Sequence, residues 1–198
     1  MNKQVVRAFI AAELPPSVTG RLEQIQNRLK VEIEGVRWVK ASNIHLTITF
    51  LGDVEPVRIE PIAKAVREQT LHRTGMTFSL AGLGAFPGIS RPRVIWVGLE
   101  GDGTALSNLY EDLTADLEVL GFLRERRSFT PHLTLGRVKS SGDAARGLKT
   151  IMGAEKFMVD GFPFTLDGLT LFRSDLTPRG ALYTRLERFP FQGSESIC

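Results

Sequence analysis

Cysteine is almost missing from this sequence: the only one among 198 residues is Cys198, at the very end. A single thiol forms no disulfide within the chain, and it cannot build a zinc site from cysteines. Long apolar runs are missing too, since no stretch approaches the roughly 18 residues that predict a membrane-spanning helix. The start of the chain also lacks the apolar region and cleavage site of a secretory signal. We therefore expect a cytoplasmic protein with no membrane partner.

Charge of one sign is not concentrated anywhere in the chain. The formal net charge is +3, and the balance of 24% charged and 42% hydrophobic residues is typical of a globular domain. Arg outnumbers Lys by 18 to 7, which suits phosphate binding but is equally explained by compositional bias. The densest basic group is only Arg124, Arg126 and Arg127. We therefore do not expect a protein that wraps nucleic acid.

The chain repeats itself at an offset of about 86 residues. The segment FSLAGLGAF at 78–86 recurs as FTLDGLTLF at 164–172. Other features recur at the same offset to within one residue: Arg7 with Arg93, Pro92-Arg93 with Pro178-Arg179, and His45 with His132. Chance matches between short apolar segments would scatter in their spacing. The common offset therefore indicates a duplicated unit.

Each unit reads as strands alternating with helices. Apolar residues at spacings of three to four predict helices at 18–29, 56–70, 105–120 and 143–152. Alternating segments predict strands at 5–14, 35–39, 44–51, 78–86, 93–99, 127–130, 132–138, 164–172 and 180–189. We predict an α+β fold of two pseudo-symmetric lobes, each a mostly antiparallel sheet with helices on one face and with a cleft between them. Residues 1–191 then form a single bilobal domain whose lobes exchange strands, and 192–198 form a flexible tail.

Two of the three histidines lie in the same short pattern, His45-Leu46-Thr47-Ile48 and His132-Leu133-Thr134-Leu135. Alternate residues of a strand share one face, so each His lies beside its Thr while the aliphatic residues face the core. A pseudo-twofold arrangement brings both faces to one cleft. Two imidazoles suit paired acid and base catalysis near neutral pH, and two hydroxyls can donate to phosphoryl oxygens. The pattern predicts cleavage of a phosphodiester without a metal ion.

The longer context of these motifs resembles a known family. RAFIAAELP, IHLTITFLGDV, FPG followed by RVIWVGL, and FTPHLTLGR together span nearly the whole chain. They resemble the RNA 2′,3′-cyclic phosphodiesterases of the 2H phosphoesterase superfamily, formerly called 2′-5′ RNA ligases. The resemblance implies a V-shaped cleft and hydrolysis of a terminal 2′,3′-cyclic phosphate to a 2′-phosphate. It also implies that no metal or other cofactor takes part.

The resemblance also implies a role for each motif residue. By the family picture His45 acts as the general acid that protonates the departing 3′ oxygen and His132 as the base that activates water; the near-symmetric halves leave the reverse assignment open in the sequence. Thr47 and Thr134 hold the phosphate. The partners are then RNA ends with a 2′,3′-cyclic phosphate or small cyclic nucleotides, and nothing in the sequence demands more than a monomer.

Phe50 and Arg137 each lie five residues after a motif His. By the family pattern they contact the nucleotide, because aromatic and guanidinium planes stack on bases. An odd spacing puts both on the wrong face of an ideal strand. They reach the cleft only if the strand twists, bulges or ends there, and otherwise Phe50 packs in the core.

Other functions remain open from the sequence. The chain could bind nucleotides or RNA ends without turnover, or join 2′-5′ RNA ends by the reverse reaction. A metal hydrolase would need more ligands than two histidines, with Asp53 the nearest carboxylate along the chain. The third histidine, His72, lacks the flanking pattern and is expected at the surface.

Overall fold

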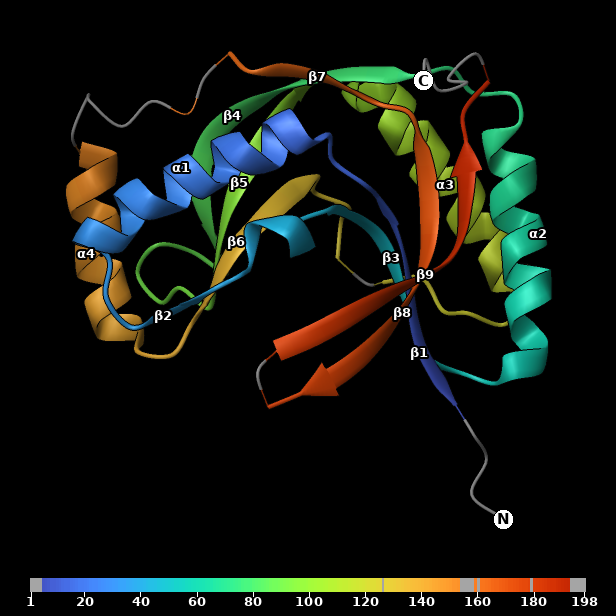
Figure 1. Cartoon of the computed structure of the whole chain (residues 1–198), viewed down its shortest axis with the longest axis horizontal. Helices are drawn as coiled ribbons and strands as arrows, with labels where there is room; N and C mark the ends of the chain where they lie inside the picture. The colour runs from blue at the N-terminus through green and yellow to red at the C-terminus, as the bar shows by residue number, and fades with distance from the viewer. Residues whose placement is uncertain (1–4, 126, 154–158, 160, 179, 193–198) are drawn as a thin grey trace.

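The computed structural model describes residues 5–125, 127–153, 159, 161–178 and 180–192. These residues form one curled antiparallel sheet flanked by helices (Figure 1). Helices α1 (Pro16–Glu32) and α4 (Ser141–Gly153) lie beside one half of the sheet. Helices α2 (Ile59–Thr70) and α3 (Gly103–Val119) lie beside the other half. The predicted α+β architecture of two lobes is confirmed.

The described strands run in a single order through the sheet. That order is β7 (Pro163–Leu166), β4 (Met76–Phe86), β5 (Val94–Gly101), β6 (His132–Val138), β3 (Leu46–Val54), β1 (Val6–Ala12), β8 (Gly168–Thr177) and β9 (Gly180–Pro190). The short β2 (Val36–Trp38) pairs with β6 outside this path. The two halves meet where β3 pairs with β6, at Leu46 and Leu133. Both residues are fully buried, so the junction of the lobes is an apolar contact directly after each motif histidine.

Each half of the sheet takes strands from both repeats. Strand β4, which ends the first repeat, pairs along its length with β5, which begins the second. Strand β1 from the start of the chain pairs with β8 from near its end. Hydrogen bonds across the sheet therefore connect the two repeats on both sides of the cleft.

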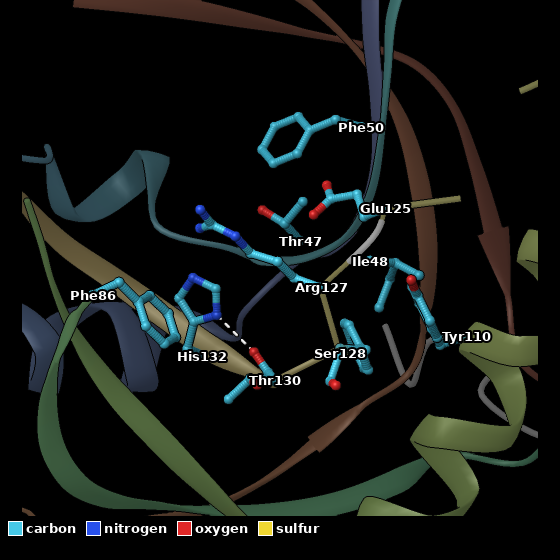
Figure 2. A pocket seen from close by; sticks show the side chains of 11 residues that line it. Thr47, Ile48, Phe50, Phe86, Tyr110, Glu125, Arg127, Ser128, Thr130 and His132 are labelled. Atoms are coloured by element: carbon cyan, nitrogen blue, oxygen red, sulfur yellow. Dashed lines mark hydrogen bonds between the residues drawn. The ribbon is translucent and has the colours of Figure 1, made fainter. Parts of the chain in front are cut away.

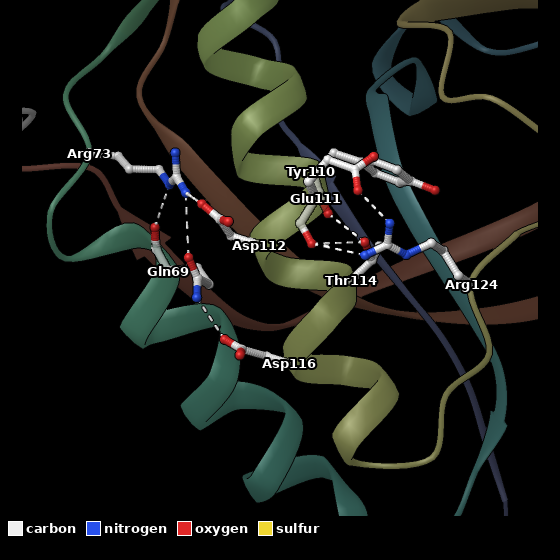
Figure 3. A network of polar contacts seen from close by, with 8 residues as sticks. All are labelled: Gln69, Arg73, Tyr110, Glu111, Asp112, Thr114, Asp116 and Arg124. Atoms are coloured by element: carbon white, nitrogen blue, oxygen red, sulfur yellow. Dashed lines mark hydrogen bonds and ion pairs between the residues drawn. The ribbon is translucent and has the colours of Figure 1, made fainter.

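The helices bury the apolar stripes that their spacing predicts. In α1 the buried stripe is Val18, Leu22, Ile25 and Leu29, and in α3 it includes Leu106, Leu109, Leu113 and Leu117. Truncating a fully buried Leu to Ala costs about 2–5 kcal/mol of stability. Side-chain contacts join α2 and the residues just after it to α3. Gln69 Nε2 of α2 donates to Asp116 Oδ2 at 2.6 Å, and Arg73, three residues after α2, pairs with Asp112 at 2.6 Å (Figure 3). Two short 3₁₀ turns, η1 (Ala41–Asn43) and η2 (Pro56–Arg58), complete the described helical elements.

Two of the predicted strands differ from the structure. Residues 127–130 form no strand; Phe129 instead stacks on Tyr110 of α3, with ring centroids 4.3 Å apart and an interplanar angle of 5°. The segment 164–172 is divided into β7 and β8 at Asp167, because its first part pairs with β4 and its second with β1 and β9. The chain thus passes from one half of the sheet to the other within one predicted strand.

Some expectations fall outside the described residues. Cys198 and nearly all of the tail expected at 192–198 lie there, as does Arg179. Within the ranges given above, no helix is long and apolar enough to cross a membrane.

Candidate active site

The two histidine motifs lie on neighbouring strands. His45 directly precedes β3, and His132 is the first residue of β6. Leu46, Ile48, Leu133 and Leu135 are buried, whereas both histidines, Thr47 and Thr134 are only partly buried. The alternation predicted from the sequence is therefore confirmed, and the strand pairing places both polar faces at the junction of the lobes.

The two imidazoles make matching hydrogen bonds. Nδ1 of His45 lies 2.9 Å from the backbone oxygen of Asn43, and Nδ1 of His132 lies 2.7 Å from that of Thr130. A carbonyl oxygen only accepts, so each Nδ1 must carry the hydrogen. This fixes the tautomer of each neutral ring and leaves Nε2 as the atom that takes or gives a proton.

The surroundings of the two rings are not equivalent. Phe9 packs on His45 with centroids 4.9 Å apart, and Tyr183 meets the same ring edge-on at 5.2 Å. His132 meets the ring of Phe86 edge-on at 4.9 Å. Burial lowers the pKa of His45 to about 4, and the positive charges of Arg137 and His132 act in the same direction. The hydrogen bond to Asn43 opposes this lowering, and a pKa of about 4 makes His45 neutral at pH 7 in the free protein.

A matched pair of β-bulges explains the odd spacing of Phe50 and Arg137. On β3 the partners of Ile10 and Ala11 are Thr49 and Thr47, so Ile48 is skipped. On β6 the partners of Ile95 and Trp96 are Gly136 and Thr134, so Leu135 is skipped. Each bulge falls three residues after the motif histidine and reverses the faces of the residues that follow.

The bulges place Phe50 and Arg137 beside the cleft. Phe50 is 56% exposed and lines the pocket next to Thr47, so its alternative placement in the core is wrong. Burial lowers the pKa of His45 and raises that of Tyr183; the positive charge of Arg137 adds to the lowering at His45 and opposes the rise at Tyr183, which puts its guanidinium on the side of these rings. Of the six residues predicted for the site, Thr47, Phe50 and His132 line one pocket, whereas His45, Thr134 and Arg137 are not among its lining residues.

A pocket of about 410 Å³ opens beside His132 and Thr47 (Figure 2). Phe50 and Phe86 contribute rings to its walls. The connection between α3 and β6 contributes Glu125, Arg127 and Ser128, none of which the motif analysis singled out for the site. The available signal in the sequence was the local density of arginines at 124–127, directly before and at the start of a segment, 127–130, that was expected to be a strand.

Asn43 also escaped the sequence analysis. Its backbone oxygen accepts the hydrogen bond from His45, and its side-chain Nδ2 donates to the backbone oxygen of Ala181 on β9 at 3.2 Å. Tyr183 on the same strand packs against His45. Strand β9 therefore contacts the His45 side of the cleft in two ways.

His72 is exposed, as predicted for a surface histidine. Among the residues that the structure describes, no three His, Cys, Asp or Glu side chains gather as they would around a metal ion.

The chain matches the family model described as LigT like Phosphoesterase twice, over residues 13–96 and 97–183. The two matches follow one another along the chain and correspond to the duplicated units. The duplication inferred from the offset of about 86 residues is confirmed by this double match.

Curated relatives and solved structures cover nearly the whole chain. Proteins named RNA 2′,3′-cyclic phosphodiesterase from Methanothermobacter thermautotrophicus and Thermotoga maritima are 34% and 33% identical to it, over 93% and 95% of this chain and 98% and 97% of theirs. The crystal structure of TT0787 of Thermus thermophilus superposes with a TM-score of 0.79 at 28% identity, covering 96% of this chain and all of that one. A structure of Escherichia coli LigT complexed with 3′-AMP gives 0.75 at 25% identity, covering 96% and 99%.

Proposed function

The chain belongs to the LigT-like phosphoesterases, the 2H phosphoesterase family, and from that premise we propose that it hydrolyses the terminal 2′,3′-cyclic phosphate of RNA to a 2′-phosphate. The observation that carries the proposal is the matched pair of imidazoles. Each is fixed through Nδ1 to a backbone oxygen and has a threonine two residues later on the same face. Relatives that carry this activity in their names cover almost the full length of the chain.

The proposed reaction needs one proton accepted and one donated. His132 Nε2 takes a proton from water as the water oxygen bonds to phosphorus. The bond from phosphorus to the 3′ oxygen breaks, and His45 Nε2 gives that oxygen a proton. Hydroxyls of Thr47 and Thr134 donate to the nonbridging oxygens, where negative charge builds up, and Arg137 adds a positive charge. The 2′ oxygen stays bonded to phosphorus, so the product is a 2′-phosphate.

The acid role of His45 requires that substrate binding changes its pKa. In the free protein a neutral His45 has no proton on Nε2 to give. A bound phosphodiester brings a negative charge, which opposes the effects of burial and of the positive charge of Arg137 and favours the charged ring. We therefore propose that His45 becomes protonated as the substrate binds.

The remaining parts of the proposal concern partners and setting. The substrates are RNA ends with a 2′,3′-cyclic phosphate or small cyclic nucleotides, and no metal or other cofactor takes part. Residues 1–191 act as a single bilobal domain, and the protein works as a monomer in the cytoplasm.

The test is hydrolysis of a short RNA that ends in 2′,3′-cyclic phosphate, with EDTA present and the 2′- and 3′-phosphate products resolved. We expect only 2′-phosphate. His45→Ala and His132→Ala should each lose about 10²-fold or more in rate. His72→Ala, which removes an exposed histidine outside the motifs, should retain full activity.

Other outcomes identify the alternatives. RNA that binds without product would indicate a binding module. Activity only after metal is added would contradict the paired-histidine mechanism. Joined 2′-5′ ends as the main product would indicate a ligase.

A further inference from the structure

The pocket beside His132 has two chemically different ends. One end holds His132 and Thr47, where the phosphate lies in the proposed reaction. The other is lined by Phe50 and Tyr110 and by Glu125, Arg127, Ser128 and Phe129. Its volume of about 410 Å³ falls in the range of small-molecule sites, which combine apolar walls with a few polar groups. The proposed function leaves this second end unassigned.

The polar residues of this end lie on an anchored segment. Arg124 pairs with Glu111 of α3 and also donates to the Glu111 backbone oxygen at 3.2 Å (Figure 3). Further along, Phe129 stacks on Tyr110 of the same helix. Glu125 and Arg127 lie between these two anchors, so their positions are set by α3.

The side chains of Glu125 and Arg127 point into the space between Phe50 and His132 (Figure 2). The guanidinium of Arg127 reaches toward His132 and Thr47, while the Glu125 carboxylate lies nearer Phe50 (Figure 2). The ring of Phe50 is 56% exposed and offers a face on which a base can stack. A phosphate at His132 would thus meet the positive charge of Arg127, and a base stacked on Phe50 would meet the negative charge of Glu125.

We propose that this pocket binds the terminal nucleoside and selects its base through Glu125. The inference rests on the proposed function for the position of the phosphate. An ionised carboxylate only accepts hydrogen bonds. Adenine, guanine and cytosine each offer an amino group, whereas uracil offers a single N–H between two carbonyl oxygens that repel a carboxylate. The site therefore favours ends that carry A, G or C and disfavours U, while Arg127 contacts the phosphate whatever the base.

Binding measurements test this selection separately from turnover. Isothermal titration of the four nucleoside 2′-monophosphates should give an affinity for 2′-UMP about tenfold weaker than for the others, as expected for one hydrogen bond to a charged group. Glu125→Gln should bring the four affinities to within about threefold, because an amide both donates and accepts. Arg127→Gln should weaken all four by a similar factor. Glu23→Gln, an exposed carboxylate on α1, should change nothing.

Kinetics on four dinucleotides that end in the cyclic phosphates of A, G, C and U should show the same order in kcat/KM. Equal affinity for all four bases, or an unchanged discrimination in Glu125→Gln, would overturn the inference even if hydrolysis is fast. If the titrations show base selection but no dinucleotide is hydrolysed, the base-binding subsite is supported and the proposed function is rejected. A base-dependent effect of Arg127→Gln would overturn the assignment of the two ends.

Discussion

At the scale of single residues, the two motif histidines differ in their surroundings although their hydrogen bonds match. Both rings donate through Nδ1 to a backbone oxygen two residues earlier. Only His45 lies against both Phe9 and Tyr183, and burial lowers its pKa to about 4. Near-symmetry of the sequence could not reveal this difference, because the aromatic neighbours of His45 come from β1 and β9, at opposite ends of the chain.

The proposed acid role gives His45 a pKa that depends on the ligand. In the free protein we expect its ring to titrate near pH 4, well below the usual 6.5. With a nucleoside 2′-phosphate bound, the added negative charge should raise this pKa by at least about one unit. The measurement is an NMR titration of the ring protons of His45, assigned with His45→Gln, in the free and bound protein.

The outcome decides between the two roles. A pKa that stays near 4 in the complex would leave His45 neutral at pH 7 and make it the base instead of the acid.

The stability of the free protein provides a second test of the pKa of His45. The His45 ring takes up a proton below about pH 6.5 in the unfolded chain, but only near pH 4 in the folded chain. Protonation of the unfolded chain therefore lowers the free energy of unfolding as the pH falls from 6.5 to about 4. Unfolding midpoints of the His45→Gln variant should fall less steeply over this range.

At the scale of strands and loops, regular patterns were predictable and local departures from them were not. The alternation of side chains along a strand correctly predicted that both His-x-Thr pairs lie on the face opposite the buried Leu46 and Leu133. The odd spacing of Phe50 and Arg137 showed that the strands must twist, bulge or end if these residues are to reach the cleft. It did not locate the bulges at Ile48 and Leu135, because no residue in either motif signals one. Each bulge is defined by the partner strand, β1 or β5, which is distant in the sequence.

The segment at 127–130 shows a second limit of pattern reading. Its counterpart in the first repeat is β2, which pairs with β6. In the second repeat, stacking of Phe129 on Tyr110 places the equivalent segment along the pocket instead. The repeat therefore predicted a strand where the structure instead has a pocket wall packed against α3.

Contact between β9 and η1 leads to a prediction about positioning. Asn43 donates to Ala181 on β9 while its backbone oxygen holds His45. Asn43→Ala removes the side-chain bond and loosens the turn that fixes the imidazole. A bond of this kind is worth about 0.5–1.5 kcal/mol, so kcat should fall roughly twofold to tenfold while KM changes little. Steady-state kinetics check this, with Ser42→Ala at the neighbouring exposed position as the control.

A purely structural role for Asn43 would give a different result. It would lower the melting temperature without changing kcat at temperatures where the variant is folded. The NMR titration of His45 provides an independent reading, since a weaker hydrogen bond from Nδ1 to the backbone oxygen of residue 43 should lower the pKa of His45 further. An unchanged pKa together with unchanged kcat would contradict the positioning role.

At the scale of the whole molecule, the interlaced strands predict that neither repeat folds alone. Cutting between residues 91 and 92 separates β4 from β5 and β1 from β8, and it leaves α1 without α4 and α2 without α3. Each half would expose unpaired strand edges and half of a shared apolar core.

We expect fragments 1–91 and 92–198 to show no cooperative thermal transition by circular dichroism. Refolded together, they should recover one transition and the native spectrum. Because each fragment supplies one motif histidine, hydrolysis of cyclic phosphate should appear only in the mixture. A cooperative transition in either fragment by itself would mean that its strands pair in another way, and that a repeat can fold as an independent unit.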